Sequence, residues 1–235
     1  MVAQFSPLIE TRQLIKVYYR KNKPPIKALD GVNVEIKPGE FVALVGRSGS
    51  GKSTFFNLVG ALDRPTSGEV LFEGKSLNAF SGADLTLFRR EKIGFVFQTF
   101  NLLPSLTVAE NVESALIHSH TSREERENKV AAVLGSLDLS DKHDCLPLEL
   151  SVGQQQKAAI ARAIVKAPVL ILADEPTGEM DPIAGKEIVE KLIEFHSKLK
   201  VTLVVASHGA FPYKQADRTL FIKDGKIVSQ KEAGY

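Results

Sequence analysis

The stretch Phe41–Leu58, FVALVGRSGSGKSTFFNL, indicates both a fold and a chemistry. Its first five residues are all apolar, which predicts a parallel strand buried on both faces by helices. The turn that follows contains three glycines: Gly46, Gly49 and Gly51. We expect them to take positive φ angles and to turn backbone N–H groups inward as a concave nest for anions. The helix expected to open at Ser53 aims its positive dipole end at the same place. The stretch therefore predicts an α/β fold built around a phosphate-binding loop.

The side chains at the end of this loop suit a nucleoside triphosphate. Lys52 places an ammonium group beside the nest, where it neutralises the outer phosphates, and the Ser53 hydroxyl is a hard oxygen ligand for Mg²⁺. A glycine-rich turn without a ligand is the alternative. The spacing Gly-x-x-x-x-Gly-Lys-Ser between a strand and a helix favours phosphate binding.

Composition excludes several classes of protein. A chain of 235 residues is long enough for one α/β domain, or for a core with a smaller lobe. The net charge of +2 gives no reason to expect nonspecific nucleic-acid binding. Cys145 is the only cysteine, so no intrachain disulfide forms and a reducing compartment is expected. We see no signal-peptide pattern and no stretch of about 18 apolar residues, so we expect a partner to supply any membrane spans.

Three further apolar stretches are expected to be buried strands: Ile93–Phe97, Val169–Ala173 and Val201–Ala206. Polar residues follow them: Gln98, the pair Asp174 and Glu175, and His208. Ligands bind at the carboxyl ends of strands in open α/β sheets. Adjacent acids after an apolar strand are unfavourable unless they are paired, solvated or linked to a metal. We expect Asp174 to hold Mg²⁺ through its water shell and Glu175 to orient and deprotonate an attacking water. For His208 a structural role is equally consistent with the sequence.

The regions on either side of the phosphate loop predict two smaller parts. Alternating residues around a KNKPP loop, Lys21–Pro25, predict an antiparallel sheet. The ring of Tyr18 or Tyr19 could stack on an adenine base or simply pack. Residues 100 to about 165 are expected to be mostly helical, with a helix whose capping box runs from Thr121 to Glu124 or from Ser122 to Glu125. Three leucines of this region look exposed around a proline: Leu102, Leu103 and Leu106.

In their order and spacing these motifs resemble the nucleotide-binding subunit of an ABC transporter, over essentially the whole chain. The matching motifs are Walker A (Gly46–Ser53), the Q-loop glutamine (Gln98), the signature (Leu150–Gln154), Walker B (Val169–Glu175), the D-loop (Gly178–Asp181) and the switch histidine (His208). FVFQTFNLLPSLTVAENV and LADEPTG are similar to the subgroup of lipoprotein-release, macrolide-efflux and FtsE-like ATPases. The resemblance implies one P-loop NTPase domain over residues 1–235, of the ABC type. It has a RecA-like parallel-sheet core, an antiparallel β subdomain and a helical subdomain at about 100–165.

The resemblance also implies roles for single residues. The catalytic residues would be Glu175, His208, Gln98 and Lys52. The ATP contacts would be Tyr18, Gly46, Arg47, Ser48, Gly49, Ser50, Gly51, Lys52, Ser53, Thr54, Ser151, Gly153 and Gln154. The Mg²⁺ ligands would be Ser53, Gln98 and Asp174, and Asp181 would communicate between paired sites. Tyr18 matches the stacking aromatic of the family better than Tyr19.

The implied partners are a second copy of the chain and an integral membrane permease subunit. In the family the signature lies at a helix N-terminus and binds the other chain's ATP, so two composite sites form in a head-to-tail dimer. The permease would dock near Gln98–Leu106, on the cytoplasmic face of the plasma membrane, and the work would be export or lipoprotein release. An FtsE-like mechanical regulator without transport is one alternative. A soluble ABC ATPase acting on nucleic acid or ribosomes is disfavoured by the charge and by the lack of a tandem cassette, so no nucleic-acid partner is expected.

Some positions depart from the family pattern. Val152 replaces the usual signature glycine, so either this position is not left-handed or the contact with the γ-phosphate is altered. Lys157 stands where arginine is common, and a lysine cannot make the bidentate hydrogen bonds that an arginine makes with a carboxylate or phosphate. Gly209 follows His208 where aspartate is frequent, and the D-loop reads Gly-Glu-Met-Asp. The catalytic set itself is intact, so an active ATPase is expected.

Overall fold

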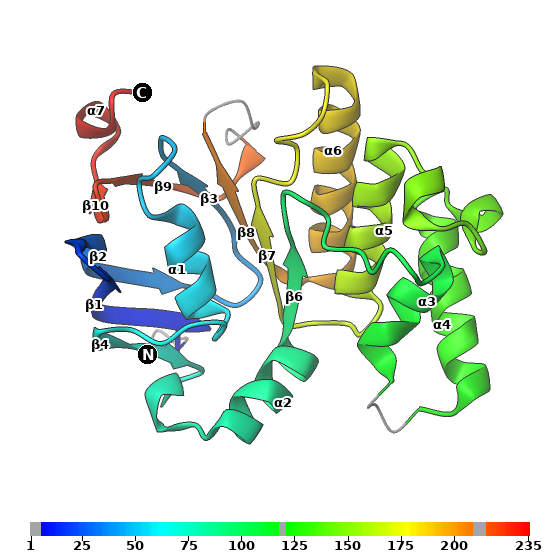
Figure 1. Ribbon diagram of the computed structural model, residues 1–235, viewed down its shortest axis with the longest axis horizontal. Coiled ribbons are helices and arrows are strands. Elements are labelled where there is room, and N and C mark those ends of the chain that lie inside the picture. Colours follow the sequence, from blue (N-terminus) through cyan, green and yellow to red (C-terminus); the bar gives the residue numbers. More distant parts are fainter. Residues whose placement is uncertain (1–5, 118–120, 209–214) are drawn as a thin grey trace, which may run out of the picture. The chain divides into compact units, whose positions relative to one another are not determined.

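The computed structural model describes residues 6–117, 121–208 and 215–235 (Figure 1). Gly209 lies outside these residues. The chain divides into two compact units: the first is Met1–Arg89 with Thr202–Tyr235, and the second is Arg90–Val201. Within the described ranges, no helix combines the length and the apolar character needed to cross a membrane.

The first unit contains the predicted antiparallel sheet, with strands in the order β2-β1-β4-β5. Its strands are β1 (Ile9–Arg20), β2 (Lys23–Ile36), β4 (Ser67–Phe72) and β5 (Lys75–Ser76). The prediction of a KNKPP loop was wrong, because β2 begins at Lys23 and contains Pro24 and Pro25. The strand β2 pairs only with β1 and so forms an edge, where the missing N–H of proline is tolerated.

The same unit carries the strand that leads into the phosphate loop. β3 (Phe41–Val45) runs parallel to both β8 (Thr202–Ser207) and β9 (Arg218–Lys223), and β10 (Lys226–Val228) pairs antiparallel with β9. Every residue of β3 and β8 is buried, as predicted for inner parallel strands. The helical elements are α1 (Lys52–Val59), η1 (Leu77–Ala79), α7 (Gln230–Ala233) and α2 (Gly82–Lys92), which begins in this unit.

The second unit combines two parallel strands, β6 (Ile93–Val96) and β7 (Leu170–Asp174), with most of the helices. The helices are α3 (Val108–Glu113), α4 (Arg123–Ser136), α5 (Val152–Ile164) and α6 (Pro182–Leu199), with short turns η2 (Ser114–Leu116), η3 (Ser140–Lys142) and η4 (Pro147–Glu149). α5 contacts β6, α3, α4 and α6, and Figure 1 shows it between α6 and the pair α3 and α4. α5 is therefore the central helix of the unit.

Two local features explain how helices of the second unit are placed. Of the two candidate capping boxes, Ser122 and Glu125 form the one that opens α4, with both reciprocal hydrogen bonds present. Gly94 lets β6 approach α5, because an added Cβ would lie 2.7 Å from the Ala163 carbonyl oxygen. The helical subdomain and the single-domain assignment remain predictions.

Candidate functional site

The glycines of the phosphate loop serve two different purposes. Gly49 and Gly51 have φ angles of 76° and 112°, as predicted. The prediction of a positive φ at Gly46 was wrong. An added Cβ at Gly46 would instead lie 2.4 Å from the Ile222 carbonyl oxygen and 2.6 Å from the Ser50 hydroxyl. Glycine is therefore required at position 46 by close packing, and at the other two positions by backbone conformation.

The loop presents donors to an anion. The N-cap residue of α1, Gly51, provides no side-chain acceptor, and the first turn contains no acidic residue. The first N–H groups of a helix have no partner within the helix, which makes the N-terminus of α1 a favourable place for an anion. The Ser50 hydroxyl is buried and has no hydrogen-bond partner within the described part of the chain. Lys52 is 4% exposed, and its Nζ donates to the carbonyl oxygens of Gly46 (2.7 Å) and Arg47 (3.1 Å). The ammonium group is thus held beside the loop.

Tyr18 and Tyr19 occupy different environments in β1. Tyr18 is half-buried and its hydroxyl donates to Asp63 at 3.2 Å, whereas Tyr19 is 78% exposed. The Lys16 Nζ lies 2.7 Å from the Asp63 carboxylate and 4.9 Å from the centroid of the Tyr18 ring. Burial raises the pKa of Asp63, but hydrogen bonds from Lys16, Arg64 and Tyr18 outweigh it and hold that pKa below its usual value. The carboxylate therefore stays charged and fixes the Tyr18 ring.

The acidic pair and the glutamine lie together in the second unit. Asp174 ends β7, and Glu175 follows it with a left-handed φ of 48°. The Gln98 amide nitrogen donates to the Glu179 carboxylate at 2.9 Å. Gly178 allows this contact, because an added Cβ there would lie 2.9 Å from that same nitrogen. Gln98, which follows β6, is thus brought to the D-loop that follows β7.

The signature forms the N-terminus of α5. Ser151 is the N-cap and exchanges two hydrogen bonds with Gln154, at 3.3 Å and 3.0 Å. Val152 is the first helical residue and its φ is not positive, which settles the alternative left open for this position: it is not left-handed. An added Cβ at Gly153 would meet no atom within 4 Å. Glycine at position 153 is therefore not required by packing within the described chain.

A cavity of about 360 Å³ lies between the N-terminal ends of α5 and α6. Its lining includes Ser151, Gly153 and Asp181. Asp181 is the N-cap of α6, and its carboxylate accepts hydrogen bonds from the Ile183 and Ala184 backbone nitrogens at 2.9 Å and 3.0 Å. The D-loop aspartate is thus positioned by the helix that it caps.

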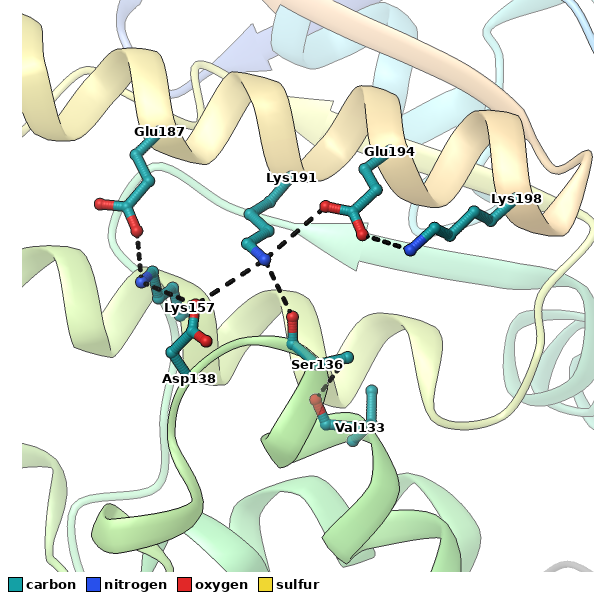
Figure 2. Close-up of polar contacts among 8 residues, drawn as sticks. All are labelled: Val133, Ser136, Asp138, Lys157, Glu187, Lys191, Glu194 and Lys198. Carbon is teal, nitrogen blue, oxygen red and sulfur yellow. Dashed lines mark hydrogen bonds and ion pairs between the residues drawn. The ribbon is translucent and has the colours of Figure 1, made fainter.

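Lys157 belongs to a chain of charges that joins α5, α6 and the end of α4. Figure 2 shows side chains of alternating sign, in the order Glu187, Lys157, Asp138, Lys191, Glu194 and Lys198. The Lys157 side chain is 12% exposed and its Nζ lies 2.6 Å from the Glu187 carboxylate. Lys191 also donates to the Ser136 carbonyl oxygen at 3.1 Å, near the C-terminus of α4. At position 157, where arginine is common, the lysine therefore makes one short ion pair, with Glu187.

We expect Lys157→Ala to lower the free energy of unfolding by about 1–2 kcal/mol, because it removes a largely buried member of the network. Lys186→Ala is the matched control, since its pair with Glu190 is exposed and should contribute about 0.3–0.5 kcal/mol. Urea midpoints at about 0.05 M and 0.5 M salt measure both effects. Equal shifts for the two variants would contradict the role of the network.

Sequence reasoning missed two residues of α5 that hold the segment after β6. Arg162 donates to the carbonyl oxygens of Phe100 (2.8 Å) and Asn101 (2.5 Å), both of which have positive φ angles. Gln156 is fully buried and donates to carbonyl oxygens in two loops. The available signal was a polar side chain within the apolar face of a helix.

Lys166 follows α5 and is a half-buried cation near a second one, Arg162. Burial, and next the charge of Arg162, lower the pKa of Lys166 from 10.5 to about 8. Below pH 8 the folded protein must keep this ammonium charged at a site that disfavours it. Between pH 8 and 10.5 the unfolded chain binds more protons than the folded one, so stability rises with pH through this interval.

We therefore expect Lys166→Met to raise the free energy of unfolding at pH 7 by about 1–3 kcal/mol, an advantage that disappears by about pH 10.5. Urea unfolding at a series of pH values tests this expectation. Lys129→Met, at an exposed position of α4, is the control and should change the free energy of unfolding little at any pH of the series. If the gain in the free energy of unfolding at pH 7 persists unchanged at high pH, the effect of Lys166→Met comes from packing and not from the lysine charge.

The leucine segment after Gln98 is less exposed than predicted. Leu103 is 49% exposed, but Leu102 and Leu106 are half-buried. The reason is Asn111, a fully buried side chain that accepts from the Leu103 backbone nitrogen at 2.7 Å. Its amide also donates to the carbonyl oxygens of Leu103, Leu106 and Thr107. The segment is therefore an ordered loop with one exposed leucine.

The predicted site residues divide between the units. Tyr18, the phosphate loop and His208, which is exposed after β8, belong to the first unit. Gln98, the signature, Asp174, Glu175 and Asp181 belong to the second.

Comparison with known proteins identifies the family of this chain. The family model described as ABC transporter matches residues 29–178. The chain is 43% identical over 223 residues to the macrolide export ATP-binding/permease protein MacB of Nitrosomonas europaea, covering 95% of this chain and 34% of that protein. It is 43% identical over 224 residues to the pyoverdine export ATP-binding/permease protein PvdT of Pseudomonas fluorescens, again covering 95% and 34%. The chain thus spans about a third of the length of these relatives.

A solved structure supports the fold. The ATP-binding cassette MJ0796, in a dimeric post-hydrolysis state bound to ADP and Pi, is similar with a TM-score of 0.85 and 40% identity, covering 94% of this chain and 97% of that one. The expected ABC-type P-loop fold, with its parallel core and antiparallel β subdomain, is therefore confirmed. The chain belongs to the ABC transporter family, as an ATP-hydrolysing cassette similar to parts of MacB and PvdT.

Proposed function

We propose that this chain powers an integral membrane partner by ATP-dependent dimerisation, in export of the efflux or lipoprotein-release type. The observation that carries the proposal is the phosphate loop, where left-handed glycines, uncapped helix N–H groups and a buried lysine surround one place. This arrangement suits the phosphates of ATP. The adenine base would stack on Tyr18, whose hydroxyl is anchored by Asp63.

Hydrolysis would use three side chains, each with its own role. Lys52 would neutralise the γ-phosphate, Glu175 would deprotonate the attacking water, and His208 would contact the γ-phosphate. Mg²⁺ would be held by Ser53, Gln98 and Asp174, whose donor atoms are the hard oxygens that this ion prefers. When bound, the ion neutralises the charge of the phosphates. The remaining loop residues, from Gly46 to Thr54, would surround the phosphates with backbone donors.

A second copy would complete each site. Ser151, Gly153 and Gln154 would reach the ATP of the partner chain, and Asp181 would link the paired sites. The open side of Gly153 supports this step, because a glycine in a helix lowers stability by about 1 kcal/mol and nothing within the described chain requires it. Dimeric structures of MJ0796 support it as well.

The membrane partner would be a permease subunit that docks near Gln98–Leu106, and the chain would lie on the cytoplasmic face of the plasma membrane. MacB and PvdT, of which this chain spans about a third, are ATP-binding/permease proteins. Within the proposed docking segment, the exposed Leu103 is held in place by Asn111. Such an ordered apolar contact suits a partner helix. Mechanical regulation without transport would use the same ATP cycle and differ only in the partner.

Glu179 gives a test of the proposed magnesium ligand. The hydrogen bond from the Gln98 amide nitrogen to Glu179 leaves the amide oxygen for the metal. We expect Glu179→Ala to raise the Mg²⁺ concentration for half-maximal hydrolysis by about 2–5-fold, since a hydrogen bond at an exposed carboxylate contributes about 0.5–1 kcal/mol. Glu190→Ala, on the exposed face of α6, is the control. An unchanged Mg²⁺ dependence would remove Glu179 from this role.

Light scattering of Glu175→Gln protein, with and without Mg-ATP, tests the proposed function. We expect a monomer without nucleotide and a dimer with Mg-ATP, because slow hydrolysis preserves the ATP that bridges the two chains. Introducing Gly153→Glu in the same background should abolish the dimer by placing a negative charge at the signature. A monomer that still binds ATP would contradict the proposal that ATP-dependent dimerisation of this chain powers the membrane partner.

A further inference from the structure

We propose that Gln156 is a positioning residue that sets the catalytic loops carrying Gln98 and Glu175 relative to each other, an inference that rests on the proposed function. No motif of the phosphate site includes this side chain. It projects from α5, the helix that the signature opens, and its exposed fraction is 0%.

Two hydrogen bonds from one amide carry the argument. The Gln156 Nε2 donates to the Pro176 carbonyl oxygen at 2.7 Å and to the Phe97 carbonyl oxygen at 3.4 Å. Pro176 follows Glu175 directly, and Phe97 directly precedes Gln98. A primary amide nitrogen has two hydrogens, so both donors of this group are used. One side chain therefore joins the backbone on which both proposed functional residues stand.

The loop after β7 depends on such support. Glu175 has a φ of 48°, which is unfavourable for a residue with a Cβ and persists where the surroundings hold it. The Gly178 backbone nitrogen closes the turn by donating to the Glu175 carbonyl oxygen at 3.0 Å. Inside that turn, Gln156 provides the bond to Pro176. A general base must be held to a fraction of an ångström, because small displacements lower the rate strongly.

Stability alone does not account for glutamine at this position. The Gln156 Oε1 is buried and lacks a hydrogen-bond partner in the described part of the chain, which is unfavourable for folding. A methionine of similar length would remove that penalty and fill the space. What glutamine adds is the pair of N–H donors to the two loops.

The test compares Gln156→Met with Gln155→Met. The Gln155 amide nitrogen donates to the Leu150 carbonyl oxygen at 3.2 Å, so its variant serves as a matched control one residue away. We expect Gln156→Met to lower kcat by about 10–100-fold while the KM and Kd for ATP change less than about 3-fold. Gln155→Met should stay within about 2-fold of the parent in all three constants.

A double-mutant cycle separates positioning from general loss of structure. If Gln156 acts through Glu175, the loss caused by Gln156→Met should shrink to less than about 3-fold in the Glu175→Gln background. A merely structural role would reduce turnover by the same factor in both backgrounds. Gln156→Asn, which keeps an amide but is one methylene shorter, should behave like Gln156→Met.

The outcomes distinguish this inference from the proposed function. Full turnover in folded Gln156→Met and Gln156→Asn proteins would overturn the positioning role while leaving Glu175 as the base. Failure of both variants to fold would also overturn it, by assigning Gln156 to the core. Unchanged turnover in Glu175→Gln alone would instead overturn the proposed base, whatever the Gln156 variants do.

Discussion

Glu175→Gln is expected to lower kcat for ATP hydrolysis by about 10²–10⁴-fold, because it removes the only proton acceptor that we assign to the attacking water. Glutamine has nearly the same size as glutamate and should tolerate the left-handed φ of 48° equally well. The affinity for ATP should stay within about 3-fold of the parent, since we assign the carboxylate to the hydrolysis step and not to nucleotide binding. Phosphate release under saturating Mg-ATP measures the turnover, and calorimetry measures the affinity.

The control for this prediction is another acidic residue of the same unit. Glu190→Gln removes a carboxylate from the exposed face of α6 and should leave both constants within about 2-fold. Turnover of Glu175→Gln within about 3-fold of the parent would show that another group accepts the proton. A parallel loss of affinity and melting temperature would instead point to disruption of the turn that the Gly178 backbone nitrogen closes.

The parts of the fold that follow short-range rules were predictable from the sequence. The strand Phe41–Val45 was predicted to the residue, because an apolar run before a glycine-rich turn has few other solutions. The capping box of α4 could be narrowed to two candidates, and hydrogen bonding selects Ser122 with Glu125. Motif resemblance supplied the rest of the architecture.

The wrong predictions have identifiable physical origins. Pro24 and Pro25 suggest a loop, but they lie in an edge strand, where proline is tolerated. Gly46 suggests a positive φ, but it is required by the nearby carbonyl oxygen of Ile222, which is distant in sequence. Leu102 and Leu106 look exposed until Asn111 folds the loop onto α3. The errors at Gly46 and at the leucines concern tertiary contacts, whereas the error at the prolines concerns the place of a strand in its sheet.

The two residues that were missed make their hydrogen bonds to distant parts of the chain. Gln156 and Arg162 act through backbone carbonyl groups of segments far along the chain. Every residue has a backbone carbonyl group, so residue type does not indicate which carbonyl accepts a hydrogen bond. Only the donor side chain can be recognised in the sequence. A buried polar side chain in an apolar helix face was the one available signal.

Lys52→Met is expected to weaken ATP binding by about 10²–10³-fold. The variant keeps the buried stem of the lysine and removes the charge, so the loop should keep its packing. A charge-assisted hydrogen bond contributes about 1.5–3 kcal/mol, and the attraction between an ammonium and a phosphate at about 4 Å adds to it at a partly buried site. A total of about 3–4 kcal/mol corresponds to the expected loss of affinity.

The position of the ammonium group makes this expectation specific. The Lys52 Nζ donates to the Gly46 and Arg47 carbonyl oxygens, so contacts within the protein hold it at the loop. Lys37→Met, at an exposed lysine of the same unit, controls for loss of one positive charge and should change affinity by less than about 2-fold. Isothermal titration with Mg-ATP and with Mg-ADP measures the effect, which should be larger for ATP because we assign the lysine to the outer phosphates. Equal losses for the two nucleotides would place Lys52 nearer the inner phosphates, and full ATP affinity in a folded variant would contradict the assignment of the phosphate loop.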